Sequence, residues 1–177
     1  MADISQSILN LTFADQFYIM GKPISNRARK FIRKHLGRSP TMIFEFHTPL
    51  TYSPTFWQSG KMITIYRDVD YYKDCITAHK YLDRLNLSSQ LLAKLELPKQ
   101  SEYLVVEEVI EGTPLNRTRF NEEQRKVLLT DFYRRVRQEF PISDLDVSPN
   151  IYVLTPTGEL RIQDVAELKF DTNTNSK

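Results

Sequence analysis

Residues 141–168 read PISDLDVSPNIYVLTPTGELRIQDVAEL, and this stretch decides the fold that the sequence predicts. Two runs rich in β-branched residues, 151–154 and 159–163, flank the turn Thr155-Pro156-Thr157-Gly158, which is typical of a β-hairpin. An acidic loop ending at Asn150 precedes the hairpin, and Asp164 follows its second strand. The alternative interpretation is an ordinary hairpin whose flanking Asp and Asn residues cap turns.

With these features in this order, the chain resembles the protein-kinase-like superfamily. In that family an Asp-Leu-x-x-x-Asn loop holds the catalytic base and a metal-ligand Asn, and an Asp after the hairpin holds Mg²⁺. The resemblance implies that Asn150 and Asp164 are metal ligands and that Asp144 or Asp146 is the base. The family places the base five residues before the Asn, whereas Asp144 lies six before Asn150 and Asp146 four before it, so both remain candidates.

A second match lies upstream, in residues 102–115, EYLVVEEVIEGTPL. This segment resembles the last strand of the family's small lobe where it runs into the hinge, whose backbone groups hold the adenine ring. The resemblance implies Val106 as the gatekeeper residue. It also implies that Glu107 and Val109 offer backbone groups to the nucleotide.

A helix is expected between the hinge and the loop, over residues 121–140. Asn121 can cap it and Gln124 can complete a capping box. Apolar residues recur every four positions along it, as a buried helix face requires: Leu128, Phe132, Val136 and Phe140, with Val127, Leu129 and Tyr133 widening the stripe.

The elements of the small lobe are expected in the residues that precede the hinge. Strands are expected over residues 42–46, 55–58 and 62–67, followed by a helix over residues 70–85. The resemblance therefore covers residues 42–168 and implies an α+β fold, with a small antiparallel sheet lobe carrying one helix, a hinge, and a truncated helical second lobe carrying the hairpin.

Three regions are expected along the chain. Residues 1–40 form an N-terminal extension, residues 41–168 form the kinase-like domain with its lobes meeting at residues 107 and 108, and residues 169–177 form a disordered polar tail.

The nucleotide chemistry of the family is missing from the small lobe. The loop over residues 47–53 contains no glycine, so its backbone cannot approach phosphates closely. Thr64 stands where the family has a phosphate-binding Lys, and Ala78 where it has the Glu that pairs with this Lys. Loss of both partners leaves neither charge unpaired, which indicates a degenerate nucleotide site.

The chain has no acidic residue from position 16 to position 44. Ser25 or Asn26 can cap a helix that ends at Leu36, with Gly37 as its stop. Five basic residues lie on this helix: Arg27, Arg29, Lys30, Arg33 and Lys34. They predict either a binding surface for a polyanion or a solvated face balanced by acids elsewhere, since the net charge is only +2.

Composition narrows the class of protein. The 177 residues are 41% hydrophobic, which is enough apolar material for one globular domain. The chain has no apolar run of about 18 residues, and its start lacks the features of a secretory signal, so we expect a cytoplasmic protein without a transmembrane segment. The single cysteine, Cys75, is expected to be a buried structural thiol, and His79 a core histidine.

Three functions remain open. The first is a pseudokinase-like binding or regulatory module that recognises a protein partner, has weak or no phosphotransfer activity and needs no cofactor. The second is an active minimal protein kinase or ATP-binding enzyme that uses ATP and Mg²⁺, with Lys61 or Arg67 as the cation for the phosphates. The third is a small α+β protein that binds nucleic acid through the basic helix, residues 25–36.

Overall fold

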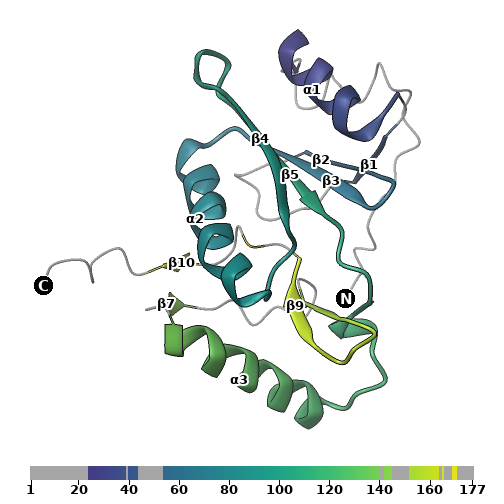
Figure 1. Ribbon diagram of the computed structural model, residues 1–177, viewed down its shortest axis with the longest axis vertical. Coiled ribbons are helices and arrows are strands. Elements are labelled where there is room, and N and C mark those ends of the chain that lie inside the picture. The colour runs from purple at the N-terminus through teal and green to yellow at the C-terminus, as the bar shows by residue number, and fades with distance from the viewer. Residues whose placement is uncertain are drawn as a thin grey trace, which may run out of the picture. The chain divides into compact units, whose positions relative to one another are not determined.

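The computed structural model describes residues 24–38, 40–43, 54–139, 142–144, 152–163, 165 and 169–170. These residues form a mixed α+β fold with three α-helices and small antiparallel sheets (Figure 1). The chain divides into two compact units, which are considered separately below. Unit 1 comprises Met1–Val69 and Leu91–Glu108, and unit 2 comprises Asp70–Gln90 and Val109–Lys177.

Unit 1 contains a five-stranded antiparallel sheet in the order β1-β2-β3-β5-β4. Its strands are β1 (Thr41–Ile43), β2 (Thr55–Gln58), β3 (Lys61–Tyr66), β4 (Leu91–Leu97) and β5 (Glu102–Glu108). Ser59 and Gly60 make the tight turn between β2 and β3, both with positive φ. The short 3₁₀ turn η3 (Pro98–Gln100) joins β4 to β5.

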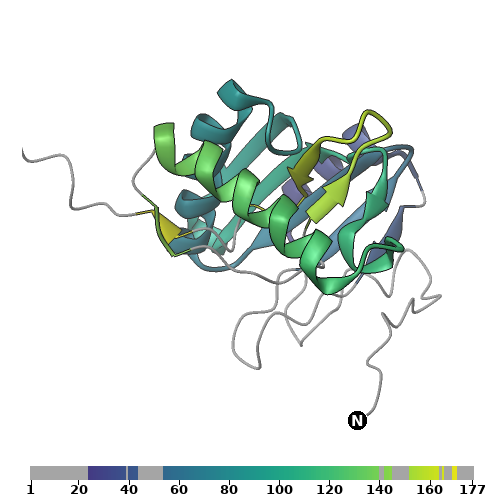
Figure 2. The ribbon, with the colours of Figure 1, turned by 90° about the horizontal axis from the view of Figure 1, so that it is seen from below.

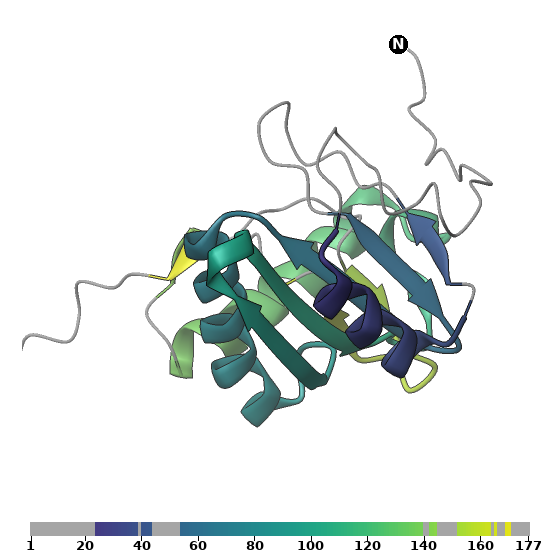
Figure 3. The ribbon, with the colours of Figure 1, turned by 90° about the horizontal axis from the view of Figure 1, so that it is seen from above.

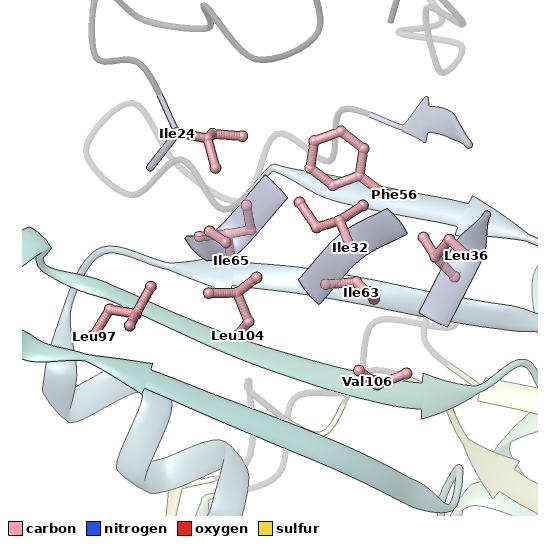
Figure 4. Close-up of a cluster of buried hydrophobic side chains, with 10 residues drawn as sticks. Ile24, Ile32, Leu36, Phe56, Ile63, Ile65, Leu97, Leu104 and Val106 are labelled. Carbon is pink, nitrogen blue, oxygen red and sulfur yellow. The ribbon is translucent and has the colours of Figure 1, made fainter. Parts of the chain in front are cut away.

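Helix α1 (Asn26–Leu36) lies over one face of this sheet and contacts β2, β3 and β5 (Figure 3). Its apolar stripe, Ala28, Ile32 and Leu36, is buried. Successive strand residues point to opposite faces, so Ile63 and Ile65 of β3 face α1 while Thr64 faces the other way. The resulting core is shown in Figure 4 and consists of Ile24, Ala28, Ile32, Leu36, Phe56, Ile63, Ile65, Leu97, Leu104 and Val106.

The limits expected for α1 are confirmed. The Ser25 side chain accepts a hydrogen bond from the Ala28 N–H at 3.2 Å, which caps the first turn. Gly37 ends the helix at φ 88°, where glycine carries no steric penalty, and its N–H donates to the Arg33 carbonyl at 3.0 Å.

Unit 2 contains nearly all of helix α2 (Val69–Leu85) together with α3 (Glu122–Glu139) and two small antiparallel sheets. The first sheet has the order β6-β8-β9, with β6 (Thr113–Pro114), β8 (Tyr152–Leu154) and β9 (Leu160–Ile162). The second sheet pairs β7 (Ile142–Asp144) with β10 (Lys169–Phe170). A 3₁₀ turn, η4 (Leu115–Arg117), follows β6.

The hairpin β8–β9 and helix α3 supply much of the core of unit 2, and α3 contacts β9 (Figure 2). Phe132 of α3 packs its ring edge against Tyr152 of β8, with centroids 5.3 Å apart. Leu87, which follows α2, accepts a hydrogen bond from the Ile162 N–H at 2.8 Å. Residues just after α2 are thus fixed to the strand that leads to Asp164.

Local signals in unit 2 are confirmed. Asn121 and Gln124 form the expected capping box, in which the Asn121 side chain accepts from the Gln124 N–H at 2.9 Å and the Gln124 side chain from the Asn121 N–H at 3.0 Å. The turn at residues 155–158 closes the hairpin, and Gly158 adopts φ 84°. Cys75 is buried, as expected.

Three features differ from the expectations. Residues 91–97, LLAKLEL, were not expected to form a strand; they pair along β5 although Leu, Ala, Lys and Glu favour helices. Asp144 lies in a strand and not in a loop, because β7 pairs with Lys169 and Phe170, which were assigned to the tail. Val127 does not widen the buried stripe of α3, since it is 64% exposed.

We predict that Gly112→Ala destabilises the protein by about 2 kcal/mol or more, because overpacking a fixed contact cannot be relieved cheaply. A Cβ at this position would lie 2.3 Å from the Leu154 carbonyl oxygen, a backbone atom, and 2.8 Å from Val153 Cγ1. The measurement is urea unfolding. Gly60→Ala is the control: its φ of 74° is also unfavourable, but no atom lies within 4 Å, so its cost should be only about 1 kcal/mol. Equal losses in the two variants would contradict the steric explanation.

Candidate functional site

Thr64, which the resemblance aligns with the family Lys, lies in a buried polar pair. Its Oγ1 is 3.2 Å from the Oγ1 of Thr55 on the neighbouring strand, and both residues are buried. Each hydroxyl thus has a partner, so the site needs no charge to satisfy it. Ala78, at the position of the family Glu, is fully buried on α2.

The two candidate replacement cations, Lys61 and Arg67, lie on the other side of the sheet from Thr64. Lys61, Ile63 and Ile65 are alternate residues of β3 and point to the same face. Lys61 therefore belongs to the face that α1 covers. Arg67 follows β3 and donates to Glu102 Oε1 at 3.1 Å. The Ser25 N–H donates to the same oxygen at 2.9 Å. Through these two hydrogen bonds Glu102, on β5, is linked both to Arg67 at the end of β3 and to Ser25, which caps α1.

The predicted hinge residues divide between the two faces and the two units. Val106 belongs to the core beneath α1, so its side chain cannot line a site on the Thr64 face as expected of a gatekeeper. Because strand residues alternate between faces, the residue of β5 on the Thr64 face is Val105, which pairs with Thr64 in the sheet register. Glu107 is on the Thr64 face and is buried, while Val109 follows the strand and is partly buried.

Sequence reasoning missed Gln163, the residue directly before Asp164. Its side-chain oxygen accepts from the Ile110 N–H at 2.7 Å, and its carbonyl accepts from the Ser89 hydroxyl at 3.3 Å. These partners are 53 and 74 residues away in the chain, and no local pattern indicates such a contact. Gln163 thereby fixes the start of the hinge exit, residues 110–112, to the end of the hairpin.

The predicted catalytic and metal-binding residues are largely outside this description. Asp144 is placed only through its backbone, in β7. Asp146, Asn150 and Asp164 lie outside the described residues. Among the residues that the structure describes, no group of three or more His, Cys, Asp or Glu side chains could hold a metal ion.

The basic side chains of α1 are mostly on its outer face. Arg27, Lys30, Arg33 and Lys34 are exposed. Arg29 is different: it is partly buried, and its Nε donates to the Ile24 carbonyl at 2.9 Å. The first turn of α1 has no acidic residue, although cations near a helix N-terminus typically cost about 0.3–1 kcal/mol.

His35, at the end of α1, experiences the positive charge of this region. Its pKa is lowered from 6.5 by burial first, and then by the nearby charges of Lys34 and Lys61. Its ring also packs against Phe31, with centroids 4.5 Å apart.

His79 of unit 2 is a buried histidine with polar neighbours. His79 is fully buried, with Nδ1 3.4 Å from Asp83 Oδ1, and the Ser88 hydroxyl donates to the same oxygen at 2.8 Å. A core histidine with a hydrogen-bond partner was expected and is confirmed. None of the described helices is long and apolar enough to span a membrane.

No protein-family model matches the chain, and no curated protein matches it in sequence. Among solved structures, the chain is similar to the co-crystal structure of WbdD and the kinase inhibitor LY294002, with a TM-score of 0.51 and 13% identity over 76% of this chain and 34% of that chain. The fold is therefore kinase-like. A medium-resolution structure of the bifunctional kinase-methyltransferase WbdD gives a TM-score of 0.47 and 14% identity over 67% and 30%. The chain spans about a third of WbdD in these comparisons, and at such identity the similarity shows the fold alone.

We predict that Glu102→Gln lowers the free energy of unfolding by about 1–3 kcal/mol, since hydrogen bonds to a buried charged group are removed or weakened. Glu102 is 1% exposed and Arg67 29%. Chemical denaturation measures the loss. The control is Glu96→Gln on β4, because the Lys94–Glu96 pair is half exposed and should contribute less than about 1 kcal/mol. If Glu96→Gln cost as much as Glu102→Gln, the Glu102 contacts would not be a special support of unit 1.

We also predict an acid-sensitive contribution from His35. Because its folded pKa lies below 6.5, the unfolded chain binds the proton more readily, and stability falls as the pH drops through about 6.5 until it levels off below the folded pKa. The measurement is the difference in unfolding free energy between about pH 7.5 and about pH 5.5. His35→Gln should show a smaller fall than the parent protein. An identical fall in both would show that His35 contributes nothing.

Proposed function

We propose that this protein is a kinase-like binding or regulatory module that recognises a protein partner and has weak or no phosphotransfer activity. The kinase-like fold supports the first part of the proposal. The second part rests on one observation: the Thr64 hydroxyl is paired with Thr55 in a buried site, while Lys61 and Arg67 belong to the opposite side of the sheet.

The residues on the Thr64 face do not fit a triphosphate. Strands β2, β3 and β5 present no Lys or Arg there, and register places these residues on it: Thr55, Trp57, Met62, Thr64, Tyr66, Tyr103, Val105 and Glu107. Lys94 of the edge strand β4 pairs in register with Val105 and shares this face, but it is paired with Glu96 at 3.3 Å. A triphosphate needs cations to offset its charge, whereas Glu107 adds a carboxylate. Loss of the cation therefore supports a binding role over transfer chemistry.

The alternative is an active minimal kinase or ATP-binding enzyme. It requires Asp144 or Asp146 as base, Asn150 and Asp164 as Mg²⁺ ligands, and a phosphate-binding cation from a segment other than β2, β3 and β5. A titration with ATP–Mg²⁺ separates the two proposals, because the alternative demands measurable ATP–Mg²⁺ binding.

We predict that ATP–Mg²⁺ at millimolar concentration leaves both the melting temperature and the fluorescence of Trp57 unchanged. Trp57 is the chain's single tryptophan, is 41% exposed, and pairs in register with Met62, which pairs in turn with Glu107. A nucleotide held at the Glu107 backbone would therefore lie within two strands of the indole. Ligand at a hundred times its dissociation constant should raise stability by about 2.7 kcal/mol.

Asp164→Ala provides the control for this titration. A saturable change in Trp57 emission together with a rise in melting temperature, both abolished in Asp164→Ala, would contradict the proposal and favour the active enzyme. A change that persists in the variant would indicate nucleotide binding without the expected metal ligand, which also contradicts the proposal.

The partner is tested by capture from the native source followed by reconstitution from purified components. The proposal expects a stoichiometric complex that forms without nucleotide. If captured proteins fail to bind the purified chain, the binding role is wrong.

A further inference from the structure

The outer face of α1 is a basic ridge, which we define as Arg27, Lys30, Arg33 and Lys34. All four side chains are exposed, and the only other exposed residue within the helix is Asn26. Within the described part of the chain, Arg27, Lys30 and Lys34 make no hydrogen bond or ion pair. At these three positions the ridge presents exposed positive charge to solvent.

The ridge covers the crest and both flanks of the helix. At about 100° per residue, Arg27 and Arg33 lie roughly 60° to either side of Lys30, and Lys34, one turn beyond Lys30, lies about 40° from it toward the side of Arg27. The charges thus span about 120° of the helix circumference and about 10 Å of its length.

The ridge is held rigidly in this orientation. Ala28 and Ile32 are fully buried against the sheet, and the Ser25 N–H is fixed to the buried Glu102 carboxylate. The apolar stripe is therefore unavailable for insertion into a bilayer. The exposed face of α1 is therefore the basic ridge together with Asn26.

Helix stability does not account for all of these charges. Arg33, Lys34 and His35 are in the last turn, where cations favour the helix dipole, but Arg27 is in the first turn, where they oppose it. At the other end of the helix, the pKa of His35 is lowered by burial first and then by the nearby charges of Lys34 and Lys61. A binding role explains a local arrangement that folding alone disfavours.

Three classes of anionic partner are compatible with charge alone, and the shape of the ridge separates them. A flat lipid surface would touch the crest and leave the flanks in water. A protein interface usually has apolar or aromatic anchors at its centre, and the exposed face of α1 has none. Phosphates on both sides of a groove would meet crest and flanks together, and they need no apolar contact.

We propose that α1 binds duplex DNA with the basic ridge in the major groove and its cations on the phosphate backbone. The major groove of B-DNA is about 12 Å wide and admits an α-helix. Arg27 and Arg33, on the two flanks, carry the planar guanidinium groups that bind phosphate with two hydrogen bonds. This inference is independent of the proposed function, because α1 covers the face of the sheet opposite Thr64.

The test is fluorescence anisotropy of the full chain with a labelled mixed-sequence duplex of about 20 base pairs over a series of salt concentrations. The decisive variant combines Arg27→Gln, Lys30→Gln and Lys34→Gln. Removing three phosphate contacts should reduce the slope of log affinity against log salt by about 3 and weaken binding at least tenfold at low salt. The melting temperature should hardly change, because these side chains are exposed.

A matched control removes the same charge from another helix. Lys126, Arg135 and Arg137 are exposed on α3, so replacing each with Gln changes net charge equally without touching the ridge. This control should bind within about twofold of the parent protein, since steering by net charge alone is screened by salt. Equal weakening in both triple variants would overturn the proposal, as it would reflect net charge only.

Competitors test the class of partner. Unlabelled duplex DNA should displace the probe, whereas poly-glutamate and phosphatidylserine vesicles of equal charge concentration should compete far less. Equal competition by poly-glutamate would assign the ridge to an acidic protein, and equal competition by vesicles would assign it to a membrane surface; either result overturns the proposal. If the triple variant does not fold, Lys30→Gln alone should still reduce the salt slope by about 1.

Discussion

The burial of the α1 stripe against the five-stranded sheet decides which side chains of unit 1 are left for binding. Ile32 is fully buried, and burying such a side chain contributes about 1.5–3 kcal/mol to stability. Because strand residues alternate in direction, covering one face also assigns every residue of β3 to the core side or the other side. Ile63 and Ile65 are committed to the core, so any ligand site on β3 must use Met62, Thr64 or Tyr66.

The same division places Thr64 on the face of the sheet that α1 does not cover. The pair Thr55–Thr64 satisfies its hydroxyls locally and contains no ionised group that would require a counter-charge. One of the two buried carboxylates of unit 1, Glu102, is on the α1 side, where it accepts hydrogen bonds from Arg67 and Ser25. Charge is thus used in this unit to fasten a helix to a sheet.

The sequence allowed prediction of features that neighbouring residues determine. The Ser25 cap, the Asn121–Gln124 capping box and the turn at residues 155–158 depend on contacts within four residues, and each is present. Strand β4 and the core position of Val106 depend on which strands pair and which face α1 covers. Those are long-range contacts, so no strand was expected over residues 91–97, and the face that Val106 occupies could not be predicted from its neighbours in the chain.

Gln163 shows the same limit at the candidate site itself. Its contacts with Ile110 and Ser89 join three segments that are far apart in the chain, and a glutamine in a short strand carries no signal for such a role. The basic residues of α1 differ in this respect, because an absence of acidic residues over a long stretch is visible in the sequence. The structure then adds that Arg29 is partly buried, whereas Arg27, Lys30 and Lys34 are exposed. A charged surface on one helix is therefore easier to predict from this sequence than the contacts that join residues 110–112 to the hairpin.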